Sequence, residues 1–238
     1  MTYHANRLLR CTLGAVALVL STAAMAANSP ATAPYASVEH ATFHQLVFAN
    51  DDVAVLKNLY PPSGDSDYHV HPRELFFVLI TAAHMSTQQP GQPLTEPRQL
   101  PAGSVGYNLM AAEPFVHRVI NNDDQPLGVV AVEIRRLAPS GGALTERSDD
   151  YVQIFDNPRL RAWRVVIAPG QSVAALTQRA NGVRVVVRGG LLLTGRPGIP
   201  DQTLALQNGD FAYQEAGETR ALHNAGTTNI ELVEFELK

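Results

Sequence analysis

Cysteine is almost absent from this chain, which has a single one, Cys11, among its 238 residues. It lies in an N-terminal segment where Arg7 and Arg10 precede the apolar run 13–20, and where residues 24–26 have the small-x-small pattern of a secretory cleavage site. Cleavage after Ala26 leaves 212 residues (238 − 26) without a thiol. Disulfides and thiolate chemistry are then excluded, and the mature chain must be stabilised by an ordinary hydrophobic core.

A hydrophobic run long enough to cross a membrane is also missing. The run 13–20 is far shorter than the roughly 20 residues that span a bilayer, so a cleaved signal peptide is favoured over a membrane anchor. A lipid anchor at Cys11 is disfavoured because Arg10 precedes it and the apolar run follows it. The sequence therefore predicts an exported protein, periplasmic or secreted, without a membrane anchor.

Blocks of basic residues do not occur. The formal net charge is −4, and it becomes −6 once Arg7 and Arg10 are removed, because no acidic residue leaves with them. Nucleic acid and anionic membrane surfaces are poor partners for such a chain. We expect a small molecule as its ligand or substrate.

Helical periodicity is nearly absent as well. The chain consists of short runs of β-branched, aromatic and other apolar residues, such as 53–60, 75–80 and 163–167, separated by Pro, Gly, Asn and Asp. This pattern is typical of a β-sandwich or barrel. The first residues after the cleavage site are rich in Ala, Pro, Asn and Ser and predict a flexible arm.

The chain repeats itself. The segment 55–64 has the pattern of 162–170, 101–107 that of 207–213, and 129–134 that of 232–237. The offsets are similar: 107 (170 − 63), 106 (209 − 103) and 103 (236 − 133). Two copies of one all-β unit explain this. The predicted organisation is a signal peptide (1–26), an arm (27–40), a first barrel (41–138), a connection (139–157) and a second barrel (158–238).

Metal-binding residues are suggested by His69-Val70-His71-Pro72-Arg73-Glu74. Side chains at i and i+2 of a strand share a face, so the two histidines have the spacing to bind one metal. Pro72 favours a break in the strand, after which Glu74 would face the same point. Imidazoles and a carboxylate suit a transition metal better than Mg²⁺ or Ca²⁺. The alternative is a pair of surface histidines beside a turn.

A second segment contains Pro101-x-Gly103 and then His117 and Asn121. Together the two segments resemble the motifs of the cupin superfamily: Gly64, His69, His71 and Glu74 match the first motif, and Pro101, Gly103, His117 and Asn121 match the second. Two departures are a short gap between His71 and Glu74 and a long segment between Gly103 and His117.

The resemblance implies two tandem jelly-roll (cupin) barrels. It also implies that His69, His71, Glu74 and His117 bind one divalent transition metal (Fe, Mn, Ni, Cu or Zn). The repeat places Leu176, Gln178, Asn181 and Arg220 at the corresponding positions, so the second barrel is predicted to lack a metal.

Four further residues lie in or beside the motifs. Phe76 and Val78 alternate with Glu74 and would line the same pocket, together with Tyr107 and Phe115. The competing interpretation is that these side chains are core residues.

Two functions remain open. The first is a metalloenzyme of the dioxygenase, decarboxylase or lyase type, acting on a small molecule. The second is a non-catalytic protein that binds a metal or small ligand. The fold alone does not choose between them.

Overall fold

The computed structural model describes residues 35–108, 114–136 and 144–238. The predicted signal peptide and most of the predicted arm lie outside these ranges. Residues 33–238 form one compact unit. The only helical segment among the described residues is a single 3-10 turn, η1 (Val38–His40); all other regular structure is β-strand. No helix in the described part of the chain has the length and apolar character needed to cross a membrane.

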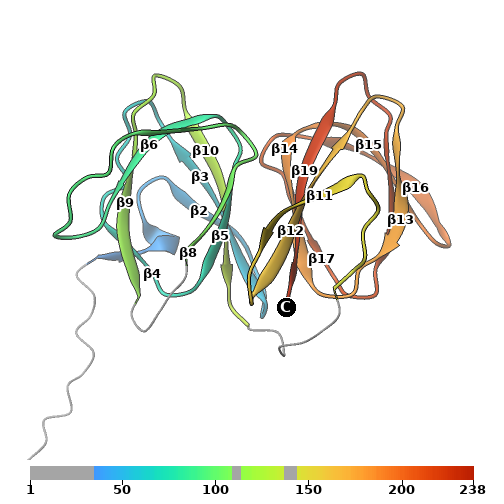
Figure 1. Cartoon of the computed structure of the whole chain (residues 1–238), viewed down its shortest axis with the longest axis horizontal. Helices are drawn as coiled ribbons and strands as arrows, with labels where there is room; N and C mark the ends of the chain where they lie inside the picture. Colours follow the sequence, from blue (N-terminus) through green and yellow to red (C-terminus); the bar gives the residue numbers. More distant parts are fainter. Residues whose placement is uncertain (1–34, 109–113, 137–143) are drawn as a thin grey trace, which may run out of the picture. The chain divides into compact units, whose positions relative to one another are not determined.

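The described residues of the first half form ten strands in two five-stranded sheets, ordered β1-β4-β9-β6-β7 and β2-β3-β10-β5-β8. Figure 1 shows them closing into a barrel. Their bounds are β1 (Ala36–Ser37), β2 (His44–Ala49), β3 (Val53–Tyr60), β4 (His69–His71), β5 (Leu75–Leu79), β6 (Ala83–Gln88), β7 (Arg98–Leu100), β8 (Val105–Asn108), β9 (Phe115–Asn121) and β10 (Leu127–Ile134).

The second half repeats this arrangement with sheets ordered β11-β12-β19-β14-β17 and β13-β18-β15-β16. Its strands are β11 (Tyr151–Asp156), β12 (Leu160–Ile167), β13 (Ser172–Thr177), β14 (Gly182–Arg188), β15 (Gly190–Arg196), β16 (Ile199–Leu206), β17 (Phe211–Gln214), β18 (Thr219–Asn224) and β19 (Ile230–Leu237). The predicted all-β fold of two jelly-roll barrels is confirmed.

The strand register reproduces the offsets of the sequence repeat. Tyr60 pairs with Leu127 in the first barrel, and Ile167 pairs with Ile230 in the second. The motif asparagine Asn121 donates to the backbone carbonyls of Pro61 and Gln125, and Asn224 donates to those of Ile167 and Thr228. Asn121 is thus fixed in a turn by the same bonds as its counterpart, and its role is structural.

Two strands lie where the sequence predicted none. β11 occupies part of the predicted connection 139–157 and pairs with β12, and β1 lies in the predicted arm and pairs in parallel with β4. Val38, just after β1, is completely buried. Both strands are short or flanked by polar residues, so their own sequence patterns are weak and pairing with a neighbouring strand decides their conformation.

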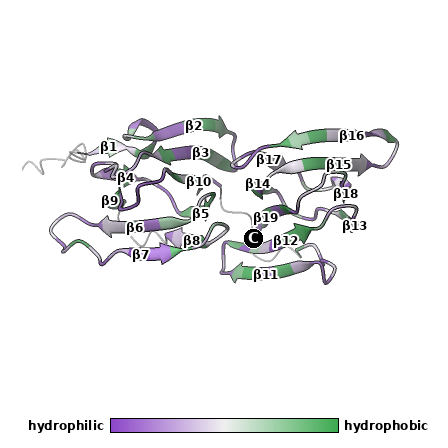
Figure 2. Cartoon of the chain, turned by 90° about the horizontal axis from the view of Figure 1, so that it is seen from above, coloured by the Kyte–Doolittle hydropathy of each residue, from purple (hydrophilic) through white to green (hydrophobic). Residues whose placement is uncertain are grey.

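The largest apolar cluster is formed by residues of both halves, and we call it the seam core. It contains Val55, Phe76, Val78 and Val130 of the first half with Val185, Val233 and Phe235 of the second. The rings of Phe76 and Phe235 meet edge-on with centroids 5.0 Å apart. Figure 2 shows that polar and apolar residues are distributed unevenly among the strands, β7 being mainly hydrophilic. Phe76 and Val78 pack into the seam core, which explains why their face of β5 is apolar.

Candidate metal centre

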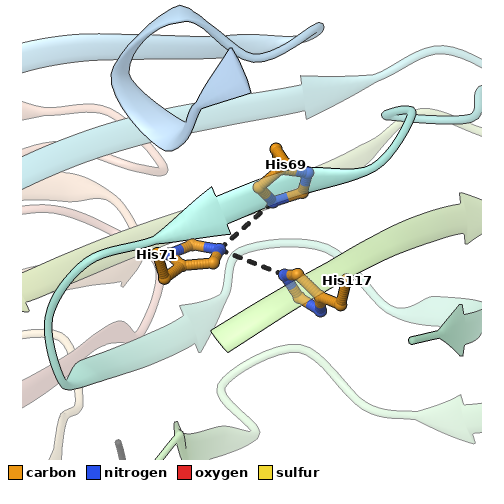
Figure 3. Close-up of side chains that lie close together, drawn as sticks. All are labelled: His69, His71 and His117. Carbon is orange, nitrogen blue, oxygen red and sulfur yellow. Dashed lines mark hydrogen bonds between the residues drawn. The ribbon is translucent and has the colours of Figure 1, made fainter. Parts of the chain in front are cut away.

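Three histidines are brought to one point by two neighbouring strands. In the antiparallel pair β4–β9, His69 lies opposite His117 and His71 lies opposite Phe115. Directly opposite residues share a face of the sheet, and so do residues two apart in one strand. All four side chains therefore lie on one face of the pair, and Figure 3 shows the three histidines converging between the two strands.

The imidazole nitrogens of these three residues, which we call the His triad, are close together. The Nε2 atom of His71 lies 3.1 Å from Nε2 of His69 and 3.1 Å from Nε2 of His117. Relative exposures are 1%, 2% and 9% for His69, His71 and His117, so the triad is buried. Within the described residues, no other group of three or more His, Cys, Asp or Glu side chains has the spacing of a metal site.

The triad is held in its uncharged form. Burial, together with the neighbouring imidazoles, lowers the pKa of His71 to about 2 and that of His117 to about 3. Burial also lowers the pKa of His69, although a hydrogen bond to the Asp67 backbone opposes this. Neutral imidazoles carry the lone pairs that metal ions need as ligands.

The protonation pattern supports a cation between these rings. His69 Nδ1 lies 3.1 Å from the carbonyl oxygen of Asp67, so this nitrogen donates and carries the proton. The lone pair of His69 is then on Nε2, directed at the other rings. Two nitrogen ligands at about 2.0–2.1 Å from one metal lie roughly 3.0–3.4 Å from each other. The observed separations of 3.1 Å fit a shared metal.

A cavity of about 200 Å³ adjoins the triad. His71 and His117 lie in its wall beside apolar side chains of β5, β9 and β10 and polar groups of β3, β6 and β7. The apolar residues of its lining are Leu75, Phe77, Leu79, Met85, Leu100, Phe115, Val119, Val129 and Ala131. This volume accommodates a small organic molecule next to the imidazoles.

Glu74, predicted as the fourth ligand, is not brought to the triad. Its carboxylate accepts hydrogen bonds from the hydroxyl of Tyr107 and from Arg159 Nε, the latter at 3.1 Å. The corresponding position of the second half, Asn181, donates to Asp52, which also accepts from Tyr213. Because the repeat relates Glu74 to Asn181, Tyr107 to Tyr213 and Arg159 to Asp52, the same polar contact is formed twice between the halves.

Three of the four predicted pocket residues also lie elsewhere. Phe76 and Val78 belong to the seam core, and Tyr107 stacks on Phe155 beside Glu74. The cavity wall is formed instead by the alternate residues of β5, Leu75, Phe77 and Leu79, which were expected on the opposite face. Side chains of β5 alternate between its two faces. The expectation that Glu74 points into the barrel therefore exchanged the two faces for every residue of the strand. Only Phe115 of the predicted set lines the cavity.

A fourth histidine, which belongs to neither sequence motif, lies beside the triad. His44 on β2 lines the cavity, and its ring lies 4.5 Å from that of His69. Its Nδ1 donates to the Thr42 carbonyl at 2.8 Å, so Nε2 accepts from the Tyr60 hydroxyl at 3.3 Å. Burial lowers the pKa of His44 to about 4. No motif marks His44, because barrel closure alone brings β2 to the site.

The second barrel has different side chains at the same place. Leu176 lies opposite Arg220 in the pair β13–β18, as His69 lies opposite His117. Arg220 donates to Gln178 at 3.1 Å and to Glu234 at 3.0 Å, and both are buried. Arg147 and Arg184 also bind Glu234. An ionic network thus fills the position that the His triad occupies in the first barrel.

Comparison with known proteins identifies a fold. No protein-family model and no curated protein matches the sequence. Among solved structures, AerE from Microcystis aeruginosa aligns with a TM-score of 0.56 and 12% identity over 83% of this chain and 98% of that chain. Salicylate 1,2-dioxygenase from Pseudaminobacter salicylatoxidans aligns with a TM-score of 0.53 and 13% identity over 78% of this chain and 71% of that one.

The chain has the cupin fold. Both of these neighbours are cupin-fold proteins, and the His triad of this chain lies on β4 and β9, the two strands that contain the motif histidines. A salicylate 1,2-dioxygenase variant in complex with gentisate aligns equally well, with a TM-score of 0.53 and 14% identity over 78% of this chain and 69% of that chain. At these identities the likeness shows the fold of this chain alone.

Proposed function

We propose that this cupin is an exported metalloenzyme that binds one divalent transition metal through His69, His71 and His117. The observation that carries the proposal is the convergence of three buried, neutral imidazoles at the wall of a cavity. Gathering them there without a cation would leave lone pairs facing each other in an apolar barrel. A metal with three protein ligands keeps coordination positions free and supplies Lewis-acid or redox chemistry when bound.

Among the reaction classes, we favour a dioxygenase acting on a small carboxylic acid. Similarity in fold to salicylate 1,2-dioxygenase, which has been crystallised with gentisate, agrees with this class. The cavity has one arginine or lysine in its wall, Arg98, and this side chain has no ion pair among the described residues. Apolar walls would enclose the body of such a molecule and exclude water, while Arg98 would bind its carboxylate.

Metal analysis of protein purified from its native compartment tests the proposal directly. We expect about one equivalent of a transition metal per chain, and a sharp loss of occupancy in His69→Ala, His71→Ala and His117→Ala. His223→Ala is the matched control, because His223 lies on β18 of the second barrel, bonded to Ser172. Unchanged occupancy in the three triad variants, or loss in the control, would refute the assignment.

Turnover separates the two candidate functions. If the chain is a dioxygenase, it consumes dioxygen in the presence of a suitable aromatic acid, and this consumption disappears in His117→Ala. Full metal occupancy without turnover on any small acid would favour the non-catalytic binding protein instead.

Export is proposed from the N-terminal sequence, which lies outside the described residues. The charged start, the apolar run and the small residues at 24 and 26 place the mature N-terminus at Ala27. Intact-mass measurement of the protein recovered from outside the cytoplasm should give a chain of 212 residues (238 − 26). Retention of residues 1–26 in that fraction would contradict the proposal.

A further inference from the structure

A carboxylate lies buried behind the His triad without a hydrogen bond. Glu133 is on β10, between β3 and β5, and its relative exposure is 0%. Both of its carboxylate oxygens lack a hydrogen-bond partner, and so does Nδ1 of His71. Glu133 Oε1 lies 3.9 Å from this nitrogen, and Glu133 Oε2 lies 3.5 Å from Arg73 Nη1. Three polar atoms without a hydrogen bond are therefore gathered at the back of one triad imidazole, and the only arginine or lysine that forms an ion pair with the carboxylate among the described residues is the half-exposed Arg73.

Such a group is costly to keep in a folded protein unless it has a partner. An unpaired buried polar atom destabilises by about 1–3 kcal/mol, and a buried charge by more. Burial raises the pKa of Glu133 to about 7, although the Arg73 guanidinium lowers it. The carboxylate is not needed by the apolar core, so its position beside His71 calls for another reason.

The corresponding position in the second barrel shows a different solution. The register relates Glu133 to Glu236, since Glu133 pairs with Leu75 and Glu236 with Gly182. Glu236 accepts hydrogen bonds from Arg147 at 3.1 Å and from the Thr145 backbone at 2.9 Å. In the second barrel this glutamate has hydrogen-bond partners, whereas Glu133 in the first barrel lies 3.5 Å from Arg73 Nη1 and 3.9 Å from Nδ1 of the triad residue His71 without a hydrogen bond to either.

We propose that Glu133 is a positioning residue whose carboxylate accepts a hydrogen bond from the Nδ1–H group of His71 and so holds the His71 Nε2 lone pair toward the metal. Closing the gap to a hydrogen bond of about 2.9 Å requires about 1 Å of side-chain movement. The proposal rests on the proposed metal site. Three neutral imidazoles bring no negative charge to a bound divalent cation. Glu133 supplies a negative charge close to the cation without contacting it. Glu74, by contrast, was predicted to bind the metal directly.

Two variants separate the charge from the hydrogen bond. Glu133→Gln keeps an acceptor and removes the charge, and Glu133→Leu removes both at similar volume. We expect the affinity for Zn²⁺, titrated into the metal-free full chain, to fall about 10–100-fold in Glu133→Leu and less in Glu133→Gln. Glu133→Leu should leave the metal-free protein as stable as wild type or more so, because the unpaired carboxylate is gone.

The tautomer of His71 gives a readout that a merely structural role would not change. In ¹⁵N NMR of the metal-free wild type, we expect His71 protonated at Nδ1, and in Glu133→Leu a shift toward the Nε2 tautomer. Glu236→Gln is the control: it should lower stability without changing Zn²⁺ affinity.

The possible failures are distinguishable. A wild-type chain that binds no Zn²⁺ refutes the proposed metal site. Zn²⁺ binding of equal affinity in wild type and Glu133→Leu, or an Nε2-protonated His71 in the wild type, overturns the positioning role alone.

Discussion

At the scale of single residues, Glu74 occupies a motif position but forms a contact between the two halves of the chain instead of joining the His triad. Its carboxylate is bound by Tyr107 and Arg159, so Glu74→Gln should weaken this contact between the halves and leave metal occupancy unchanged. Because Arg159 is 37% exposed, solvent screens the ion pair, and we expect a loss of only about 1–2 kcal/mol in the free energy of unfolding. Urea denaturation and metal analysis of the same preparation measure both quantities.

Asn181→Ala provides the comparison, since it removes the equivalent contact to Asp52 on the other side of the repeat. It should destabilise by a similar amount, again with full metal occupancy. Loss of metal in Glu74→Gln but not in Asn181→Ala would show that Glu74 swings to the triad as a fourth ligand, as the sequence motif suggested.

The sequence predicts the His triad and misses what surrounds it. His69 and His71 lie two apart, and His117 follows a recognisable turn, so local patterns are enough to identify them. Glu133 and His44 come from β10 and β2, which reach the site only when the barrel closes. Neither position carries a motif, and no local propensity indicates which distant strand will lie behind an imidazole.

At the scale of strands, β5 shows why one misplaced residue affects a whole element. Residues 72–74 separate β4 from β5, and the number of residues in such a turn decides which face the next strand presents. Both faces of β5 are apolar, so hydrophobic alternation does not reveal the error. The strand was correctly predicted, and only contact with the second half shows which side is the cavity.

Alanine variants of adjacent residues on β5 distinguish its two faces. Phe76 is completely buried in the seam core, so Phe76→Ala should cost about 3–5 kcal/mol of folding stability. Phe77 lines the cavity and is only partly buried, so Phe77→Ala should cost less and enlarge the cavity. Chemical denaturation measures the costs, and crystal structures of the variants show the cavities. A larger stability loss for Phe77→Ala would contradict this assignment of faces.

At the scale of the whole molecule, the two barrels contain different polar side chains at equivalent positions. The interior strands of the second barrel are held by three arginines around Glu234, all buried. The arginines satisfy the carboxylate, and the neighbouring Glu236 takes up part of the remaining positive charge. The first barrel gathers neutral imidazoles at the equivalent place, which gives it a site that is open to an external cation. Among the described residues, one half therefore has the spacing of a metal site and the other has a fixed ionic core.

The buried neutral histidines of the first barrel predict how the stability of the metal-free protein changes at low pH. The pKa values of His44, His69, His71 and His117 are all lowered in the folded state, mainly by burial, to about 4, 2 and 3 for His44, His71 and His117. Unfolded histidine titrates near 6.5, so below that pH the unfolded chain binds more protons than the folded one. The stability contributed by the neutral histidines is therefore fully present above pH 6.5 and is lost as the pH falls.

Glu133 opposes this trend, because its pKa is raised to about 7 and its contribution grows as the pH falls from 7 toward 4.5. The effect of four histidines exceeds that of one carboxylate, so the free energy of unfolding decreases as the pH falls. The decrease is on the order of 1 kcal/mol per pH unit for each uncompensated histidine. Urea unfolding of the chelator-treated full chain between pH 7.5 and 4.5 measures it. A variant with His69, His71 and His117 all replaced by Asn should show a much shallower slope, since three of the four proton-binding differences are removed. Equal slopes in the two proteins would mean that the triad is already protonated in the folded state, which is incompatible with three imidazoles poised to bind a metal.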